Sequence, residues 1–329
     1  MPLRRWLIGT CLGLMAMTGC KDEEPTPPPP PTPLGNGSIG SIKPAAHDAA
    51  VFTSPLDATP NPTGELVFFT ARNEEGAGVF RSAASGGAVM VLYAGEPISG
   101  PVGITISSDS SQVYVADPAA LVNDQDEGTI WSLPAVGGTP AALSGTAGYS
   151  PRGILLKDEA GSDVLYFTGK SPGDGLPGVF KVPAAGGAVT AISTGGPFSD
   201  PNGIAVTGEG TIYVVDSAAE DLEAGSARII EVKGSTTKLL RDGLKVGFPA
   251  GIALSQDEQV LLISALDPAT GKDQVVRIEL ATMQQTAVSD VIGGYEEAAG
   301  LHRAAKAEVY AWADSSADGS GTVFVLTPP

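Results

Sequence analysis

The sequence predicts an all-β fold, a propeller of six four-stranded antiparallel blades, and three observations support that prediction. A turn of the type Pro-x-Gly-Ile recurs along the chain, and the glycines of five successive copies are 50, 50, 48 and 49 residues apart. A period near 50 with β-type composition is typical of propeller blades. Apolar stretches of strand length follow each turn, and glycine pairs suited to hairpins follow several of them. The five turns are residues 101–104, 151–154, 201–204, 249–252 and the degenerate 298–301.

Each repeat has the same internal order, which the third of these five copies illustrates. The inner strand is expected at residues 203–207, the second strand at 212–216 and the third at 229–232. The second strand is apolar on both of its faces, as expected when neighbouring blades cover both sides of a sheet. The fourth, outer strand is short and variable. The corresponding second strands are residues 113–117, 164–168, 260–263 and 309–314.

A further repeat precedes these five. Residues 66–70 match a second strand, residues 79–81 a third strand, and Gly86-Gly87 a hairpin. Counting back 46 residues from Pro101 reaches a degraded turn at residues 55–58, which brings the number of repeats to six.

The last repeat stops after its third strand, so its fourth strand must come from elsewhere or leave an edge unpaired. Residues 50–53 precede the first turn, where the fourth strand of a preceding blade would lie. We therefore expect this N-terminal segment to complete the sixth blade and close the ring.

The N-terminus has the features of a secretory signal. Arg4 and Arg5 precede an apolar run over residues 6–17, and Thr18-Gly19-Cys20 follows. The run is too short to cross a bilayer core of about 30 Å. The segment resembles a bacterial lipobox, with Met17 in place of the usual leucine. The resemblance implies cleavage after residue 19 and lipidation of Cys20, and a plain secretory signal is the alternative.

A proline-rich segment follows, with seven prolines in residues 25–33. Proline favours extended polyproline II, so we expect a disordered tether over residues 20–45 and the propeller over residues 46–329. Acyl chains on Cys20 would anchor the protein in a membrane. Inner-membrane retention signals have an aspartate where this chain has Lys21. We therefore expect the outer membrane, and it stays open on which side of that membrane the protein lies.

Composition limits the partners. The chain has 19 Lys and Arg against 37 Asp and Glu, and loss of Arg4 and Arg5 brings the net charge to −20. Such a protein repels nucleic acid and anionic lipid. Cys20 would be the one cysteine after cleavage, which excludes an internal disulfide and a thiolate metal site. We expect a monomer with a single folded domain.

The turn at residues 201–204 together with the strand at 212–216 resembles the six-bladed propellers of the NHL, YWTD and gluconolactonase (regucalcin-like) group. The resemblance covers residues 48–329 and implies that the residue between proline and glycine faces the top of the central channel, the end where these turns lie. These six residues are Leu56, Val102, Arg152, Asn202, Ala250 and Ala299.

The regucalcin-like branch hydrolyses sugar lactones with a divalent ion held by a glutamate, an asparagine and an aspartate. Asn202 matches the asparagine, whereas Ala250 stands where that branch has its aspartate. The first blade offers Leu56, with Asp57 beside it, and no glutamate. A hard divalent ion needs several oxygen ligands, so the match to a metal site is incomplete.

The loops between second and third strands are acidic and are expected on the same top face. They form either a negative rim that attracts cations or a basic partner, or a solvated surface. Residues 123–128 match part of a calcium loop without the full EF-hand pattern, so calcium stays an alternative. The acidic residues are Asp124, Asp126, Glu127, Glu220, Asp221 and Glu223, with Glu74, Glu75, Asp174, Asp267 and Asp318 in smaller loops.

Asp117, Asp216 and Asp314 recur at one position of the blade, where an aspartate usually caps the adjacent turn. His302 begins an inner strand and can point into the channel, but no Gly-x-Ser-x-Gly nucleophile motif accompanies it. The candidate ligand contacts at the top face and channel are Arg152, Asn202, Asp117, Asp216, Asp314 and His302.

The sequence thus predicts a lipid-anchored envelope protein without a resident cofactor. Its propeller would bind an envelope protein or a small ligand through an acidic top face, without catalysis. A metal-dependent lactone hydrolase with its site near Asn202 is the alternative, and a purely structural envelope protein is a third interpretation.

Overall fold

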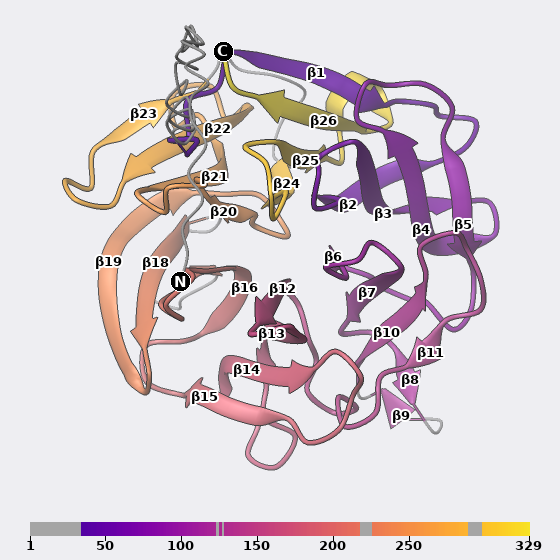
Figure 1. The fold of residues 1–329 in the computed structure, drawn as a ribbon, viewed down its shortest axis with the longest axis horizontal. Coiled ribbons are helices and arrows are strands. Elements are labelled where there is room, and N and C mark those ends of the chain that lie inside the picture. Colours follow the sequence, from indigo (N-terminus) through magenta and orange to yellow (C-terminus); the bar gives the residue numbers. More distant parts are fainter. Residues whose placement is uncertain (1–33, 123–124, 127, 218–225, 289–297) are drawn as a thin grey trace, which may run out of the picture. The chain divides into compact units, whose positions relative to one another are not determined.

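A computed structural model describes residues 34–329 except residues 123–124, 127, 218–225 and 289–297. It confirms the predicted all-β architecture: six four-stranded antiparallel sheets stand in a ring (Figure 1). The described residues contain a single helical turn, the 3₁₀ segment Ala317–Gly319. None of the described helices is long and apolar enough to span a membrane.

Each blade runs from an inner strand at the axis to an outer strand at the rim. The first three blades are β2 (Thr53–Pro60), β3 (Leu66–Asn73), β4 (Gly76–Ala83) and β5 (Met90–Ala94); β6 (Gly103–Ile106), β7 (Gln112–Asp117), β10 (Thr129–Pro134) and β11 (Ala141–Ala142); and β12 (Ile154–Glu159), β13 (Ser162–Lys170), β14 (Pro177–Pro183) and β15 (Thr190–Thr194). The last three are β16 (Asp200–Val206), β17 (Ile212–Ser217), β18 (Ser226–Lys233) and β19 (Thr236–Lys245); β20 (Ile252–Leu254), β21 (Val260–Leu266), β22 (Asp273–Glu279) and β23 (Gln285–Ala287); and β24 (Ala298–Arg303), β25 (Tyr310–Asp314), β26 (Thr322–Thr327) and β1 (Ser41–Ala46). The short strands β8 (Leu121–Val122) and β9 (Gln125–Asp126) pair between β7 and β10.

The core lies between the blades, which explains why the second strands are apolar on both faces. Val214 and Val215 point to opposite faces of β17, and both are fully buried. Aromatic side chains pack against one another in several of these cores. Phe69 of β3 stacks on Phe80 of β4, with ring centroids 5.5 Å apart. Burial on both faces therefore fixes each sheet between its two neighbours.

An N-terminal strand closes the ring, as predicted, but its position differs from the prediction. The strand that pairs with β26 is β1, in the register Ile42 with Leu326 and Lys43 with Val325. The prediction that residues 50–53 form this strand is wrong. Those residues precede and enter β2, and the N–H groups of Val51 and Phe52 donate to the carbonyl of Asp48 in a turn.

Packing explains the shift. The ring of Phe52 lies inside the core, 4.8 Å from that of Phe69, so this residue cannot serve an outer strand. In β1, Pro44 is tolerated because the outer strand has one free edge. The sequence predicted that the folded unit begins at residue 46. Because β1 is Ser41–Ala46, the unit begins before that residue.

Candidate functional site

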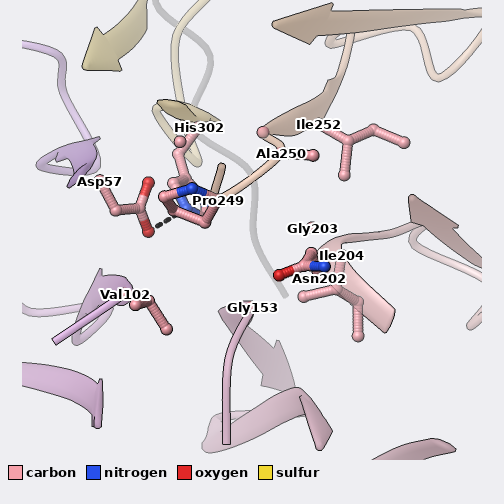
Figure 2. A pocket seen from close by; sticks show the side chains of 12 residues that line it. Asp57, Val102, Gly153, Asn202, Gly203, Ile204, Pro249, Ala250, Ile252 and His302 are labelled. Carbon is pink, nitrogen blue, oxygen red and sulfur yellow. Dashed lines mark hydrogen bonds and ion pairs between the residues drawn. The ribbon is translucent and has the colours of Figure 1, made fainter. Parts of the chain in front are cut away.

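The inner strands converge at the axis on a narrow neck of about 10 Å³, roughly the space of one water (Figure 2). Glycines make this approach possible. A Cβ on Gly103 would lie 2.0 Å from the carbonyl oxygen of Arg152, and one on Gly153 would lie 1.9 Å from that of Asn202. The recurring glycine of the turn is therefore required because the backbone of the next blade leaves no room for a side chain.

Three of the six residues predicted to face the channel line this neck: Val102, Asn202 and Ala250. The other three are absent from its lining. Leu56 is half-buried, Ala299 is fully buried in a core cluster, and Arg152 lies above the neck beside Asp200.

Asp57 takes the place of the turn glycine in the first blade. Its N–H donates to Thr70 Oγ1, as the N–H of Gly153 donates to Thr168 Oγ1. The Asp57 side chain fits because Gly300 of the last blade has none: a Cβ there would lie 1.7 Å from Asp57 Oδ1. Aligning the repeats on their glycines would have identified this substitution from the sequence.

The Asp57 carboxylate joins three blades at the axis. Its Oδ2 accepts from the N–H of Ile104 at 2.8 Å and lies 3.0 Å from His302 Nε2. Its Oδ1 accepts from the N–H of Ala58 at 2.9 Å. Both side chains of the Asp57–His302 pair are buried, with 3% and 7% exposed. The structure thus places His302 in the channel lining, as predicted, and gives it a carboxylate partner.

A polar cluster surrounds Asn202 at the top of the neck. Arg152 Nη1 donates to Asp200 Oδ2 at 2.7 Å and lies 3.5 Å from Asn202 Oδ1. Asn202 Nδ2 donates to the Asp200 carbonyl at 2.8 Å and to Ser217 Oγ at 2.5 Å. The Arg152 guanidinium stands over the Phe248 ring at 5.8 Å, and 49% of Phe248 is exposed. We call Arg152, Asp200, Asn202 and Phe248 the top cluster.

The top cluster does not fit a divalent ion. The Asn202 side-chain oxygen faces a guanidinium, which repels a cation, and Asn202 is 1% exposed. Across the described ranges, no three His, Cys, Asp or Glu side chains come together as a metal site would need. The partial calcium loop at 123–128, Asp124, Asp126 and Glu127 included, falls largely outside the described residues, as do Glu220, Asp221 and Glu223.

Asp117, Asp216 and Asp314 are buried and cap turns. Asp117 accepts from the N–H groups of Ser99 and Gly100, at 2.8 and 3.0 Å. Removal from water raises the pKa of all three carboxyl groups. The turn-capping interpretation therefore agrees with their placement, and none is exposed at the top face. In the same way, Asp216 accepts from Ser199 and Asp200, and Asp314 from Ser316 and Ala317.

These aspartates alternate around the ring with hydroxyl residues. They belong to the second, fourth and sixth blades. In the first, third and fifth blades a hydroxyl at the end of the second strand accepts from the inner turn instead. The three hydroxyl residues are Thr70, Thr168 and Ser264, at donor distances of 3.2, 2.9 and 2.8 Å. The recurring aspartates were predictable from the sequence, whereas this two-blade alternation was not predicted.

Comparison with known proteins shows the fold. No family model matches the chain, and no curated protein matches its sequence. Among solved structures, it is similar to the PQQ-bound aldose sugar dehydrogenase of Streptomyces coelicolor, at 16% identity over 87% of this chain and 98% of that one, with a TM-score of 0.62.

Two further structures have the same architecture. A gluconolactonase of Xanthomonas campestris is 16% identical over 91% of this chain and 99% of that one, with a TM-score of 0.57. A putative glucose dehydrogenase of Thermus thermophilus is 14% identical over 87% and 99%, with a TM-score of 0.56. The shared feature is the propeller itself.

Proposed function

We propose that this chain is a non-catalytic binding protein of the bacterial cell envelope. Cys20 carries the lipid anchor in the outer membrane, the proline-rich segment is a spacer, and the propeller binds an envelope protein or a small ligand through its top face. The lipobox-like residues before Cys20 and the seven prolines of residues 25–33 support the anchor and the spacer.

The top cluster is the observation that supports this function most strongly. Asp200 fixes one side of the Arg152 guanidinium, and Phe248 supports its face. Within the described part of the chain, its other nitrogens, Nε and Nη2, have no hydrogen-bond partner. The cluster therefore presents fixed donors beside an exposed aromatic ring. Arginine and aromatic side chains are enriched in binding interfaces, because they combine hydrogen bonds with apolar contact.

The charge of the surrounding loops supports a partner with a basic surface. Glu74, Glu75 and Asp174 are exposed in loops between second and third strands, at the same end of the blades as the top cluster. The backbone N–H of Leu176 holds the pKa of Asp174 below its usual value, so this carboxylate stays charged. A negative rim speeds the approach of a basic partner.

Capture from an envelope extract with matched variants tests this function. The full chain that carries both Arg152→Ala and Phe248→Ala should lose a partner that the wild type retains. Lys306→Ala at the opposite end of the channel is the control and should retain it. A partner held equally by all three proteins would contradict a role for the top cluster.

A lactone hydrolase is the second candidate, because the fold is shared with a gluconolactonase and Asn202 lies at the axis. The guanidinium beside Asn202 Oδ1 disfavours it. Lactone turnover that requires an added divalent ion and is abolished by Asn202→Ala would establish this alternative in place of the binding role.

A further inference from the structure

A second, larger cavity opens at the lower end of the channel, opposite the Pro-x-Gly turns. Its volume is about 640 Å³, within the range of small-ligand sites. The lower halves of the inner strands and the turns that follow them line it, and all six blades contribute residues. Nothing in the proposed role of the top face uses this cavity.

The inner end of the cavity adjoins the neck. His302 lines both the cavity and the water-sized neck above it, and its bond to Asp57 fixes the ring in that position. Figure 2 shows this pair on one side of the neck and Asn202 on the other. The neck has room for about one water, so the lower cavity narrows to that size at its inner end, and we call this cavity the lower funnel.

Half of the 24 residues that line the funnel are aliphatic, and six charged residues lie around its mouth. Leu155 and Leu156 are half-buried, so their side chains still present apolar surface to an occupant. Two of the wall's three threonine hydroxyls accept hydrogen bonds: Thr105 Oγ1 accepts from the N–H of Leu156 at 3.1 Å, and Thr207 Oγ1 from that of Thr211 at 2.9 Å. No Phe, Tyr or Trp is among the described lining residues. The aliphatic half of the wall offers no side-chain groups to replace the hydration of a polar molecule.

Charged side chains occur around the mouth, and their signs balance. Three bases, Lys157, Arg303 and Lys306, face three acids, Asp109, Asp158 and Glu258.

Several of these groups already have partners. Arg303 donates to the carbonyls of Leu254 and Ala304, both at 2.7 Å, and Glu258 accepts from the N–H of Gly208 at 2.6 Å. The mouth thus creates no net field that would draw an ion of either sign into the aliphatic interior, where an unpaired charge is costly.

We propose that the lower funnel is a second binding site, which takes one small, uncharged and mainly apolar molecule. Burial of apolar surface against the aliphatic wall supplies the affinity. The balanced mouth and the aliphatic part of the wall favour such a molecule over an ion. The site is independent of the top cluster, so it stands or fails separately from the partner-binding role.

Acedan, an uncharged naphthalene ketone whose fluorescence reports apolar surroundings, is the probe. The full chain is titrated in a fixed concentration of non-ionic detergent. Leu155→Trp and Val206→Trp fill the funnel from two blades. Leu239→Trp is the matched control, because Leu239 is exposed on the outer strand β19. Subtracting the signal of acedan in the same detergent without protein removes partition into micelles.

The wild type and Leu239→Trp should bind acedan saturably, and both filled variants should lose at least about tenfold in affinity. An anionic naphthalene sulfonate of similar size should bind at least about tenfold more weakly than acedan. Melting curves confirm that each variant is folded. Equal binding by wild type and a folded filled variant, no saturable binding by the wild type, or tighter binding of the sulfonate would overturn the proposal.

Discussion

Asp57 Oδ2 lies 3.0 Å from His302 Nε2, and this contact joins the first blade to the last at the axis of the ring. The two residues are 245 positions apart in the chain. At the rim of the same seam, β1 completes the last blade beside β26. The junction between the two ends of the chain is thus held at both its inner and its outer side.

Removing the Asp57 carboxylate should weaken this seam. Asp57→Ala leaves the buried N–H of Ile104 and His302 Nε2 without their acceptor, and buried donors left unpaired cost about 1–3 kcal/mol each. We expect the free energy of unfolding in urea to fall by about 3 kcal/mol. Asp242→Ala, an exposed residue of β19, should change it by less than about 0.5 kcal/mol. Equal effects of the two substitutions would refute the role of Asp57.

The closing strand gives a second prediction. Ala46 is 2% exposed and pairs with Val323, so Ala46→Asp buries a charge at the seam. The melting temperature should fall by several degrees, because an unpaired buried charge destabilises the fold. Lys43→Ala lies in the same strand with its side chain exposed and should leave the melting temperature nearly unchanged. If both variants melt like the wild type, β1 does not close the ring.

Asp109 should titrate well below an ordinary aspartate. The Ser107 hydroxyl, 2.6 Å away, and Ser111 lower the pKa of Asp109 to about 2. Ser107→Ala should raise it toward 3.8, and Ser108→Ala is the matched control. Carboxyl ¹³C shifts followed with pH measure both values. A wild-type Asp109 that already titrates near 3.8 would contradict the hydrogen bonds assigned to this turn.

Asp216 shows the opposite behaviour. Burial raises its pKa above 3.8, so the folded state binds this proton more tightly than the unfolded state. Its contribution to stability is therefore largest below pH 3.8 and is lost as the pH rises through the raised pKa. A difference of one between the pKa in the folded state and the pKa in the unfolded state corresponds to about 1.4 kcal/mol of unfolding free energy.

The difference in unfolding free energy between wild type and Asp216→Asn isolates this effect. Over that pH window the wild type should lose stability relative to the variant, and Asp242→Asn should show no such trend. If the unfolding free energy of the wild type instead rises relative to that of Asp216→Asn as the pH rises, the carboxylate is stabilised in its charged form.

Much of the fold was predictable, because the inter-blade core imposes a strong pattern. The second strand expected at residues 212–216 is β17, Ile212–Ser217, whose apolar residues are buried on both faces. The outer strands carry no such pattern. They range from the two residues of β11 to the ten of β19, because their outward surfaces meet solvent.

The site was predictable only in part. Asn202 and His302 lie at the axis, as expected, because their place in the repeat fixes their place in the ring. The partner of His302 comes from a blade at the other end of the chain, and no local pattern announces such a contact. The closing strand was missed for a similar reason: Pro44 and Lys43 suit a free edge, and pairing with β26 alone makes the segment a strand.

The metal content of the purified full chain tests the central claim that the axis supports binding without metal chemistry. We predict that the chain holds far less than one divalent ion whose binding depends on Asn202. A chelator should leave its melting temperature unchanged. One stoichiometric divalent ion that is lost in Asn202→Ala, with melting lowered by the chelator in the wild type alone, would contradict the account.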